Sequence, residues 1–368
     1  MIQFLVINLV CMYKFNSLNH YIFFKDNSFV FVGRAPLRIS FAGGGTDLEE
    51  YHNKYDGYAI SSTINKYTYV IAKLRNDDKL QGFSPDFASH LPPKKHHPKS
   101  VQGHEIVLEG LRELKFKKGI DMYLATDVEP NSGLGASSSL TANFVNVITS
   151  IQKKKMDKYK IAMNAYHIGH NILKWGIGKQ DEFAAVYGGF NLLKFTKNKV
   201  YVYPISIKKS TQKELQEKSL LFHIGNRKHS EGILKSQIGD IKKSNKKTIE
   251  SLHKAKELAL EMRDSLKMND LTKFSQILRT GWEVKKNFTQ GITNPRIENI
   301  SNKAITNGAT SLKVTGAGGG GHLYVFAEPR YHMKITKALQ KLGVQKVNFE
   351  YENSGSTVFD LNNLKIRK

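Results

Sequence analysis

The loop Pro130–Ser139 (PNSGLGASSS) constrains this chain more than any other feature, because it lies between a predicted strand and a predicted helix. The pattern of Asp121–Val128 favours a strand, and that of Leu140–Gln152 favours an amphipathic helix. Glycines let the backbone turn and approach a polyanion, and the amides of the helix N-terminus attract phosphate. The loop therefore predicts a site for the phosphates of ATP. The alternative is a helix cap with a tight turn.

The serines of this loop can supply hydroxyl groups to a phosphate oxygen or to Mg²⁺. The arrangement differs from a Walker A loop, since no Lys-Ser or Lys-Thr pair closes it.

Composition excludes several other classes of protein. The 368 residues include one cysteine, which fits a reducing compartment, so we expect a cytoplasmic protein. No stretch approaches the roughly 20 apolar residues that span a bilayer, so no membrane partner is expected. The formal charge of +24 is mostly dispersed lysine, and no helix-turn-helix, zinc-finger or RNP-type signature accompanies it, so nucleic acid is not an expected partner. We interpret residues 1–28 as an N-terminal extension of unknown role.

Two further glycine-rich segments predict close contact with a ligand. Gly43–Gly45 is followed by Thr46 and Asp47, whose carboxylate can accept hydrogen bonds from sugar hydroxyls; the alternative is a hairpin turn with a helix-capping residue. Four consecutive glycines, Gly318–Gly321, separate two predicted strands. Because each glycine costs conformational entropy, such a run needs a reason. It predicts that a ligand, or the loop Pro130–Ser139, lies close against its backbone.

A fourth segment, Gly176–Gly189, carries the acid Asp181 close to Lys179. Asp181 fits two interpretations equally on spacing alone. It is either an N-terminal helix residue, or an ionised carboxylate that accepts the proton of a hydroxyl group.

These four segments, in this order, resemble the superfamily of galactokinase, homoserine kinase, mevalonate kinase and phosphomevalonate kinase (GHMP kinases). Gly133–Ser138 resembles its second motif and Val314–Gly321 its third. Four stretches are similar to one branch, the D-glycero-D-manno-heptose 7-phosphate kinases: Ala35–Asp47, Gly178–Asp181, Gly291–Arg296 and Gly316–Gly321.

The resemblance implies an ATP-dependent sugar kinase. It would phosphorylate the anomeric hydroxyl of D-glycero-D-manno-heptose 7-phosphate to the 1,7-bisphosphate, for nucleotide-activated heptose and surface polysaccharide. The alternatives are a kinase of the same fold for fucose or galactose, and a catalytically weak protein that senses sugar or ATP. The implied partners are a sugar phosphate, ATP and Mg²⁺, with a homo-oligomer as a further expectation.

The resemblance also implies roles for individual residues. Catalysis would involve Asp181, Arg38 and Lys179. ATP would be bound by Pro130, Ser132, Gly133, Leu134, Gly135, Ala136, Ser137, Ser138 and Ser139, with Ser137 also the metal-side hydroxyl. The substrate would be bound by Gly43, Gly44, Gly45, Thr46, Asp47, Arg227, Lys228, Gly318, Gly319 and Gly320. Arg296 and Lys313 are further candidates for contacting the sugar's phosphate.

One stretch departs from the family pattern. The superfamily usually places a magnesium-binding Glu in the helix before the catalytic Asp, but Tyr166–Asn171 contains no carboxylate. Another acid such as Glu182, or water with the ATP phosphates, would have to complete the magnesium shell.

The implied fold is α+β with two domains. Residues 29–207 would form an N-terminal ATP-binding domain resembling ribosomal protein S5, and residues 208–368 a ferredoxin-like C-terminal domain. Within them we expect strands over Phe29–Ser40 and Tyr58–Leu74, a loop over Leu80–Ser100 and a helix over Ile161–Leu173. Thr211–Lys286 is expected to be a long helical region, with a strand over Leu220–Gly225 inside it.

Overall fold

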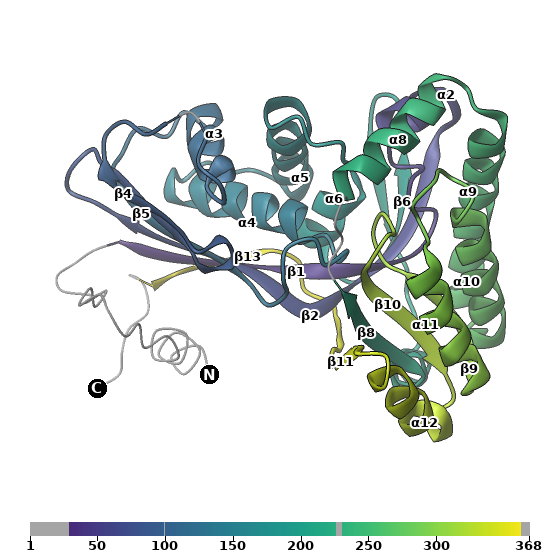
Figure 1. Cartoon of the computed structure of the whole chain (residues 1–368). Coiled ribbons are helices and arrows are strands. Elements are labelled where there is room, and N and C mark those ends of the chain that lie inside the picture. The colour runs from purple at the N-terminus through teal and green to yellow at the C-terminus, as the bar shows by residue number, and fades with distance from the viewer. Residues whose placement is uncertain (1–28, 99, 226–229, 362–368) are drawn as a thin grey trace.

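The computed structural model describes residues 29–98, 100–225 and 230–361, and the predicted extension 1–28 lies outside them. Two long antiparallel strands run through the molecule (Figure 1), β1 (Val30–Ala42) and β2 (Gly57–Leu74). The structure confirms the strands predicted at these positions. β1 ends at the turn that carries the first glycine segment.

The large sheet has nine strands, with β1 and β2 at its centre. The others are β3 (Leu80–Ser84), β4 (Ser89–Lys94), β5 (Ile120–Thr126), β6 (Phe190–Phe195), β7 (Val200–Pro204), β12 (Tyr351–Glu352) and β13 (Thr357–Asp360). The loop predicted over Leu80–Ser100 is therefore wrong in part. A hairpin of β3 and β4, joined through the short 3₁₀-helix η1 (Pro85–Phe87), occupies most of it. β4 is an edge strand, and edge strands tolerate its two prolines.

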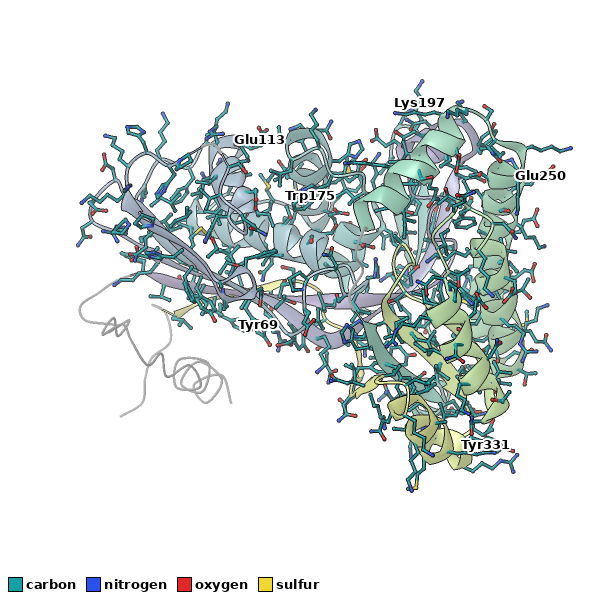
Figure 2. All side chains as sticks on the ribbon, in the orientation of Figure 1. Tyr69, Glu113, Trp175, Lys197, Glu250 and Tyr331 are labelled. Carbon is teal, nitrogen blue, oxygen red and sulfur yellow. The ribbon has the colours of Figure 1, made fainter. Side chains whose placement is uncertain are left out.

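One face of this sheet is covered by helices (Figure 1). They are α3 (Glu105–Glu113), α4 (Ala136–Ile151), α5 (Lys158–Tyr166) and α6 (Gln180–Tyr187). The predicted helix over Ile161–Leu173 is divided: α5 continues as a π-helix, η2 (His167–Ile172). Alternation along β2 buries Val70 and Ala72 beneath the helices, whereas Figure 2 shows Tyr69 on the opposite face.

The smaller sheet has four antiparallel strands in the order β11-β8-β10-β9. These are β8 (Ser219–Gly225), β9 (Ala309–Val314), β10 (Gly321–Ala327) and β11 (Gln345–Val347). The accompanying helices are α7 (Lys209–Glu217), α8 (Ser230–Lys242), α9 (Lys246–Lys267), α10 (Leu271–Lys285), α11 (Pro295–Thr306) and α12 (Pro329–Gln340). The strand predicted over Leu220–Gly225, inside the helical region Thr211–Lys286, is observed as β8. Asn245, Asp270 and Asn294 begin three of the helices, because each side chain accepts a backbone N–H of the first turn.

The two sheets share one apolar core rather than meeting at a polar boundary. Phe41 of β1 lies against three aromatic rings from different elements, with ring centroids 6.2 Å from Phe190, 5.3 Å from Phe274 and 5.6 Å from Tyr324. This packing fixes the end of β1, and with it the glycine turn that follows.

The chain crosses between the sheets more than once. β12 pairs with β2 and β13 pairs with β1, so residues near the C-terminus complete the large sheet. The division into domains 29–207 and 208–368 remains a prediction. The strands β12 and β13 belong to the predicted C-terminal domain in sequence, but they pair in the large sheet.

Candidate active site

A cavity lies where β1, the N-termini of α4 and α6, and helices α8 to α10 converge. Its lining includes residues from all four segments that the sequence singled out: Arg38, Gly43, Gly44, Gly45, Asp47, Asn131, Ser132, Gly133, Gly135, Ala136, Ser137, Ser138, Gly178, Asp181, Lys313, Gly316 and Ala317. Among the described residues, the charged side chains of the lining are three cations and two carboxylates: Arg38, Lys285, Lys313, Asp47 and Asp181. Such a cavity suits an anionic ligand with several hydrogen-bonding groups.

Arg38 and Asp181 form the central pair of this cavity. The Arg38 Nε donates to Asp181 Oδ1 at 2.7 Å and Nη2 donates to Oδ2 at 2.5 Å, a bidentate ion pair. The remaining guanidinium nitrogen donates to the Gly133 carbonyl at 2.8 Å. Arg38 is thereby fixed to both the acid and the glycine–serine loop, while the Asp181 side chain stays 23% exposed toward the cavity.

The glycine–serine loop begins α4 with two glycines in the left-handed region, Gly133 at φ 81° and Gly135 at φ 78°. A Cβ at Gly135 would lie 3.1 Å from Asp181 Oδ2 and 3.3 Å from Arg38 Cζ. The absence of a side chain at Gly135 therefore lets the helix N-terminus lie directly beside the ion pair.

The serines of this loop do not all face the cavity. Ser137 and Ser138 line it, but the Ser139 hydroxyl lies in the core, 3.1 Å from the Pro36 carbonyl and 3.1 Å from the Thr68 hydroxyl. Pro130 and Leu134, also predicted to bind ATP, are not among the lining residues. Leu134 is buried in the core shared by the two sheets.

The turn after β1 presents its glycines and one acid to the cavity. Asp47 accepts two backbone hydrogen bonds: its Oδ1 from the N–H of Gly45 at 2.8 Å, and its Oδ2 from the N–H of Gln180 at 3.2 Å. Burial, with the nearby charge of Asp181, raises the pKa of Asp47. Thr46 is fully buried and closes the turn instead: its hydroxyl lies 2.8 Å from the Gly43 carbonyl and accepts the Tyr58 amide at 3.0 Å.

Lys179 points away from Asp181. Its ammonium forms an ion pair with Glu49 of α2 (Glu49–Tyr55) at 3.0 Å and lies over the Tyr166 ring. The geometry thus gives its predicted catalytic role no support.

The predicted substrate-binding glycines Gly318 and Gly319 pack against protein rather than lining the cavity. A Cβ at Gly318 would lie 2.7 Å from the Ile292 carbonyl, and the Gly319 amide donates to that carbonyl at 2.8 Å. Gly320, also predicted to bind substrate, is likewise not a lining residue. The residue after this run, His322, does lie beside the glycine–serine loop, with its ring 2.7 Å from the Ser132 carbonyl.

The predicted cations differ in position. Arg227 and Lys228 lie outside the described residues. Arg296 is exposed, with its guanidinium 3.3 Å from the Leu342 carbonyl, whereas Lys313 lines the cavity. Of the two candidates that lie in the described residues, Arg296 and Lys313, the structure places Lys313 in the cavity.

Sequence reasoning missed several polar residues that line the cavity, among them Gln180, Gln237 and Lys285. The side-chain nitrogen of Gln180 donates to Asp181 Oδ1 at 3.1 Å, and its side-chain oxygen accepts a hydrogen bond from the Ser40 hydroxyl at 2.9 Å. These two bonds position the acid. Gln237 of α8 is 3% exposed, with an amide nitrogen that has no hydrogen-bond partner among the described residues. Lys285 ends α10 and donates to the Gly316 carbonyl. Gln180 could have been found from its place beside Asp181; the two in the helical region carry no local signal.

Glu182 is fully buried, and neither of its carboxylate oxygens has a hydrogen-bond partner in the described chain. Burial, reinforced by the charge of Asp181, raises its pKa to about 8. It is not one of the cavity-lining residues. Among residues 29–98, 100–225 and 230–361, no group of three His, Cys, Asp or Glu side chains is arranged to hold a metal ion.

Comparisons with known proteins identify the family of this chain. Residues 103–189 match the GHMP kinases N terminal domain, and residues 262–345 match the GHMP kinases C terminal domain. The chain is 31% identical over 332 residues to a D-glycero-alpha-D-manno-heptose 7-phosphate kinase from Campylobacter jejuni subsp. jejuni serotype O:2, covering 88% of this chain and 96% of that protein.

Solved structures give the same result. A D-glycero-D-manno-heptose 1-phosphate kinase from Bacteriodes thetaiotaomicron superposes with a TM-score of 0.74 and 25% identity, covering 90% of this chain and 99% of the other. A mevalonate kinase gives a TM-score of 0.68 at 19% identity, covering 88% and 99%, which shows the shared fold alone.

The chain therefore belongs to the GHMP kinases, which are phosphotransferases with a hydroxyl group as acceptor. Within that family it is a homologue of heptose 7-phosphate kinase, which supports a sugar-kinase role. The predicted family, two-domain fold and enzyme class are confirmed.

Proposed function

We propose that this protein transfers the γ-phosphoryl group of ATP to the anomeric hydroxyl of D-glycero-D-manno-heptose 7-phosphate. The observation that carries the proposal is the Arg38–Asp181 ion pair, fixed to the carbonyl of Gly133 in the glycine–serine loop. That arrangement places a carboxylate and a guanidinium together at a helix N-terminus suited to phosphate. The acceptor sugar follows from homology to the heptose 7-phosphate kinase.

Asp181 would accept the proton of the attacking hydroxyl or orient that hydroxyl. Its oxygens are held by Arg38 and Gln180, so the carboxylate is positioned before the acceptor arrives. The Arg38 guanidinium, beside the loop, would offset negative charge that develops on the transferred phosphoryl group. Asp47 and the turn Gly43–Gly45 would contact the sugar hydroxyls, together with Gln237, whose side-chain nitrogen lies beside Gly45.

Mg²⁺ fits this cavity as an ion that arrives with ATP. The Ser137 hydroxyl lies in the lining on the first turn of α4, whereas Tyr166–Asn171 supplies no carboxylate and Glu182 is buried outside the lining. Ser137 would contact the ion, and phosphate oxygens and water would supply the other ligands, as Mg²⁺ commonly retains water. When bound, the ion would neutralise charge on the β- and γ-phosphates.

Cellular location and assembly extend the proposal. None of the helices in the described parts of the chain is long and apolar enough to cross a bilayer. We expect the enzyme in the cytoplasm, where ATP is available, acting on small molecules and not on nucleic acid. Homo-oligomerisation remains a prediction.

Release of ADP tests the acceptor. The full chain is given ATP and Mg²⁺ with heptose 7-phosphate, free heptose, galactose or fucose, and ADP is measured by a coupled assay. We expect turnover with heptose 7-phosphate, with the product identified by NMR as phosphorylated at the anomeric position. Turnover only with unphosphorylated sugars would exclude the heptose phosphate as substrate.

Asp181→Asn tests the catalytic assignment. We expect kcat to fall by about 10²–10⁴-fold, the usual contribution of a general acid–base group, while the Kd for an ATP analogue changes little. The Asn side chain keeps the shape of the site and loses the basic oxygen. A kcat close to that of the unchanged enzyme would remove Asp181 from the proton-accepting role.

A further inference from the structure

Lys313 is a buried cation within the cavity lining. It is 5% exposed, and its Nζ donates to the Phe41 carbonyl at 2.9 Å, where β1 runs into the Gly43–Gly45 turn. An ammonium group has three N–H donors. The Phe41 carbonyl is the only protein acceptor within hydrogen-bond distance in residues 29–98, 100–225 and 230–361. Donor capacity is therefore available to a ligand.

The charge of Lys313 is not balanced by protein. No carboxylate of the described residues lies within ion-pair distance of its Nζ, and the charge that acts on it is that of Arg38. Arg38 itself is neutralised by Asp181. A buried cation beside another cation is unfavourable unless an anion joins it. Burial first, then Arg38, lowers the pKa of Lys313 to about 7.

The other charged groups of the cavity do not balance the charge of Lys313. Arg38 comes from β1, Asp181 from α6, Lys285 from α10 and Asp47 from the turn after β1, and all of them line the cavity. On the neighbouring strand β10, Tyr324 is the cross-strand partner of Lys313, and burial raises the pKa of that phenol to about 12. The described part of the cavity lining thus holds one cation more than it holds carboxylates.

We propose that Lys313 binds a phosphoryl oxygen of the ligand and takes up a proton from solvent as that ligand enters. The inference rests on the proposed function, because the ligands of a sugar-phosphate kinase carry the phosphoryl groups. The source of the oxygen is either the nucleotide or the phosphate of the sugar, and the two are tested separately.

The direction of the proton change follows from the charges. Near pH 8 the ligand-free amine is mostly neutral, since its pKa is about 7. A phosphoryl anion favours the ammonium form, so binding draws a proton from the buffer. Phosphate monoesters, with a second pKa of about 6, are already dianions at that pH and release no proton. Below about pH 6 Lys313 is charged in both states, so the uptake disappears.

Calorimetry measures this proton. A non-hydrolysable ATP analogue with Mg²⁺, and heptose 7-phosphate alone, are each titrated into the full chain near pH 8, in two buffers of different ionisation enthalpy. The dependence of the observed heat on buffer enthalpy gives the protons taken up per site. We expect an uptake approaching one near pH 8 with at least one of the two ligands. Near pH 6 the uptake should vanish and give way to a small net release with the sugar phosphate, because its phosphate is only partly ionised there and loses a proton on binding a cation.

Three variants separate this role from general effects. K313M should abolish the uptake and weaken that ligand by about 10–100-fold, the range for a hydrogen bond to a charged group. K313R stays charged at every pH, so it should bind more tightly than K313M without uptake. Lys285→Met, which removes another cavity lysine, should leave the proton number unchanged. Circular dichroism checks that each variant is folded.

The proposal is overturned if the unchanged enzyme takes up no proton with either ligand. It is also overturned if K313M takes up the same number of protons, or binds both ligands as the unchanged enzyme does. If the enzyme instead phosphorylates an unphosphorylated sugar, the proposed acceptor fails. The nucleotide titration then decides the role of Lys313 independently.

Discussion

The two glycine-rich loops around the cavity look alike in sequence and do different things in the structure. Gly135 lies beside the Arg38–Asp181 pair, so in this loop the missing side chain brings the N-terminus of α4 close to the reactive groups. Gly318 lies against the backbone of Ile292, so the close approach there is between two parts of the protein. A run of glycines therefore indicates close packing, but its neighbours decide whether a ligand or a second loop occupies the space.

Gly135→Ala should give the larger effect on catalysis. The added Cβ would lie close to Asp181 and Arg38, and alanine at φ 78° is strained as well. We expect kcat/KM to fall by about 10²-fold or more, since small displacements of reacting groups have effects of this size. Steady-state kinetics measures it, with unfolding followed in parallel. If activity persists while stability falls, the first loop is also mainly structural and the comparison fails.

Gly318→Ala should show the opposite balance. Its Cβ would lie 2.7 Å from a backbone carbonyl that cannot move easily, at φ 99°. We expect the free energy of unfolding to fall by about 1–3 kcal/mol, as for other overpacked sites. Turnover per folded molecule should stay near that of the unchanged enzyme. Denaturant titration and active-site counting separate the two quantities. Loss of substrate affinity at unchanged stability would show that this glycine contacts the ligand, as the sequence predicted.

Two serines within the first loop sharpen the comparison further. Ser139→Ala removes a buried hydroxyl that forms hydrogen bonds from the first turn of α4 to Pro36 and Thr68. We therefore expect the free energy of unfolding to fall by about 1 kcal/mol. Ser137→Ala changes a cavity-lining hydroxyl and should leave stability unchanged, while the affinity for Mg²⁺ with ATP falls several-fold. Thermal unfolding and nucleotide titration measure the two effects. If Ser137→Ala and Ser139→Ala changed stability and nucleotide affinity by the same amounts, the distinction between a cavity-facing and a core-facing serine would fail.

Sequence reasoning succeeded where periodicity or a motif is strong. β1, β2 and α4 were predictable from alternation and helical spacing, and the glycine–serine loop from its composition. It did less well with the hairpin of β3 and β4, because an exposed, proline-containing edge carries no apolar alternation. β12 and β13 were missed because strands of two and four residues leave no pattern.

Side-chain direction limited the prediction of the site. Lys179 and Asp181 are two residues apart, and residues at that spacing around a helix start do not face each other. Asp181 is held instead by Arg38, 143 positions away in the sequence. Spacing left the role of Asp181 undecided. Only the fold, which brings β1 beside α6, joins the carboxylate to its cation.

The return of β12 and β13 to the large sheet bears on how the chain matures. Thr63 and Glu352 are 289 positions apart, yet the hydroxyl of one bonds the carbonyl of the other. A ribosome makes the centre of this sheet long before it makes the strands that flank it. Such distant pairing slows folding and leaves strand edges uncovered in the meantime. The half of the protein that is synthesised first therefore reaches its final form only after the other half has emerged.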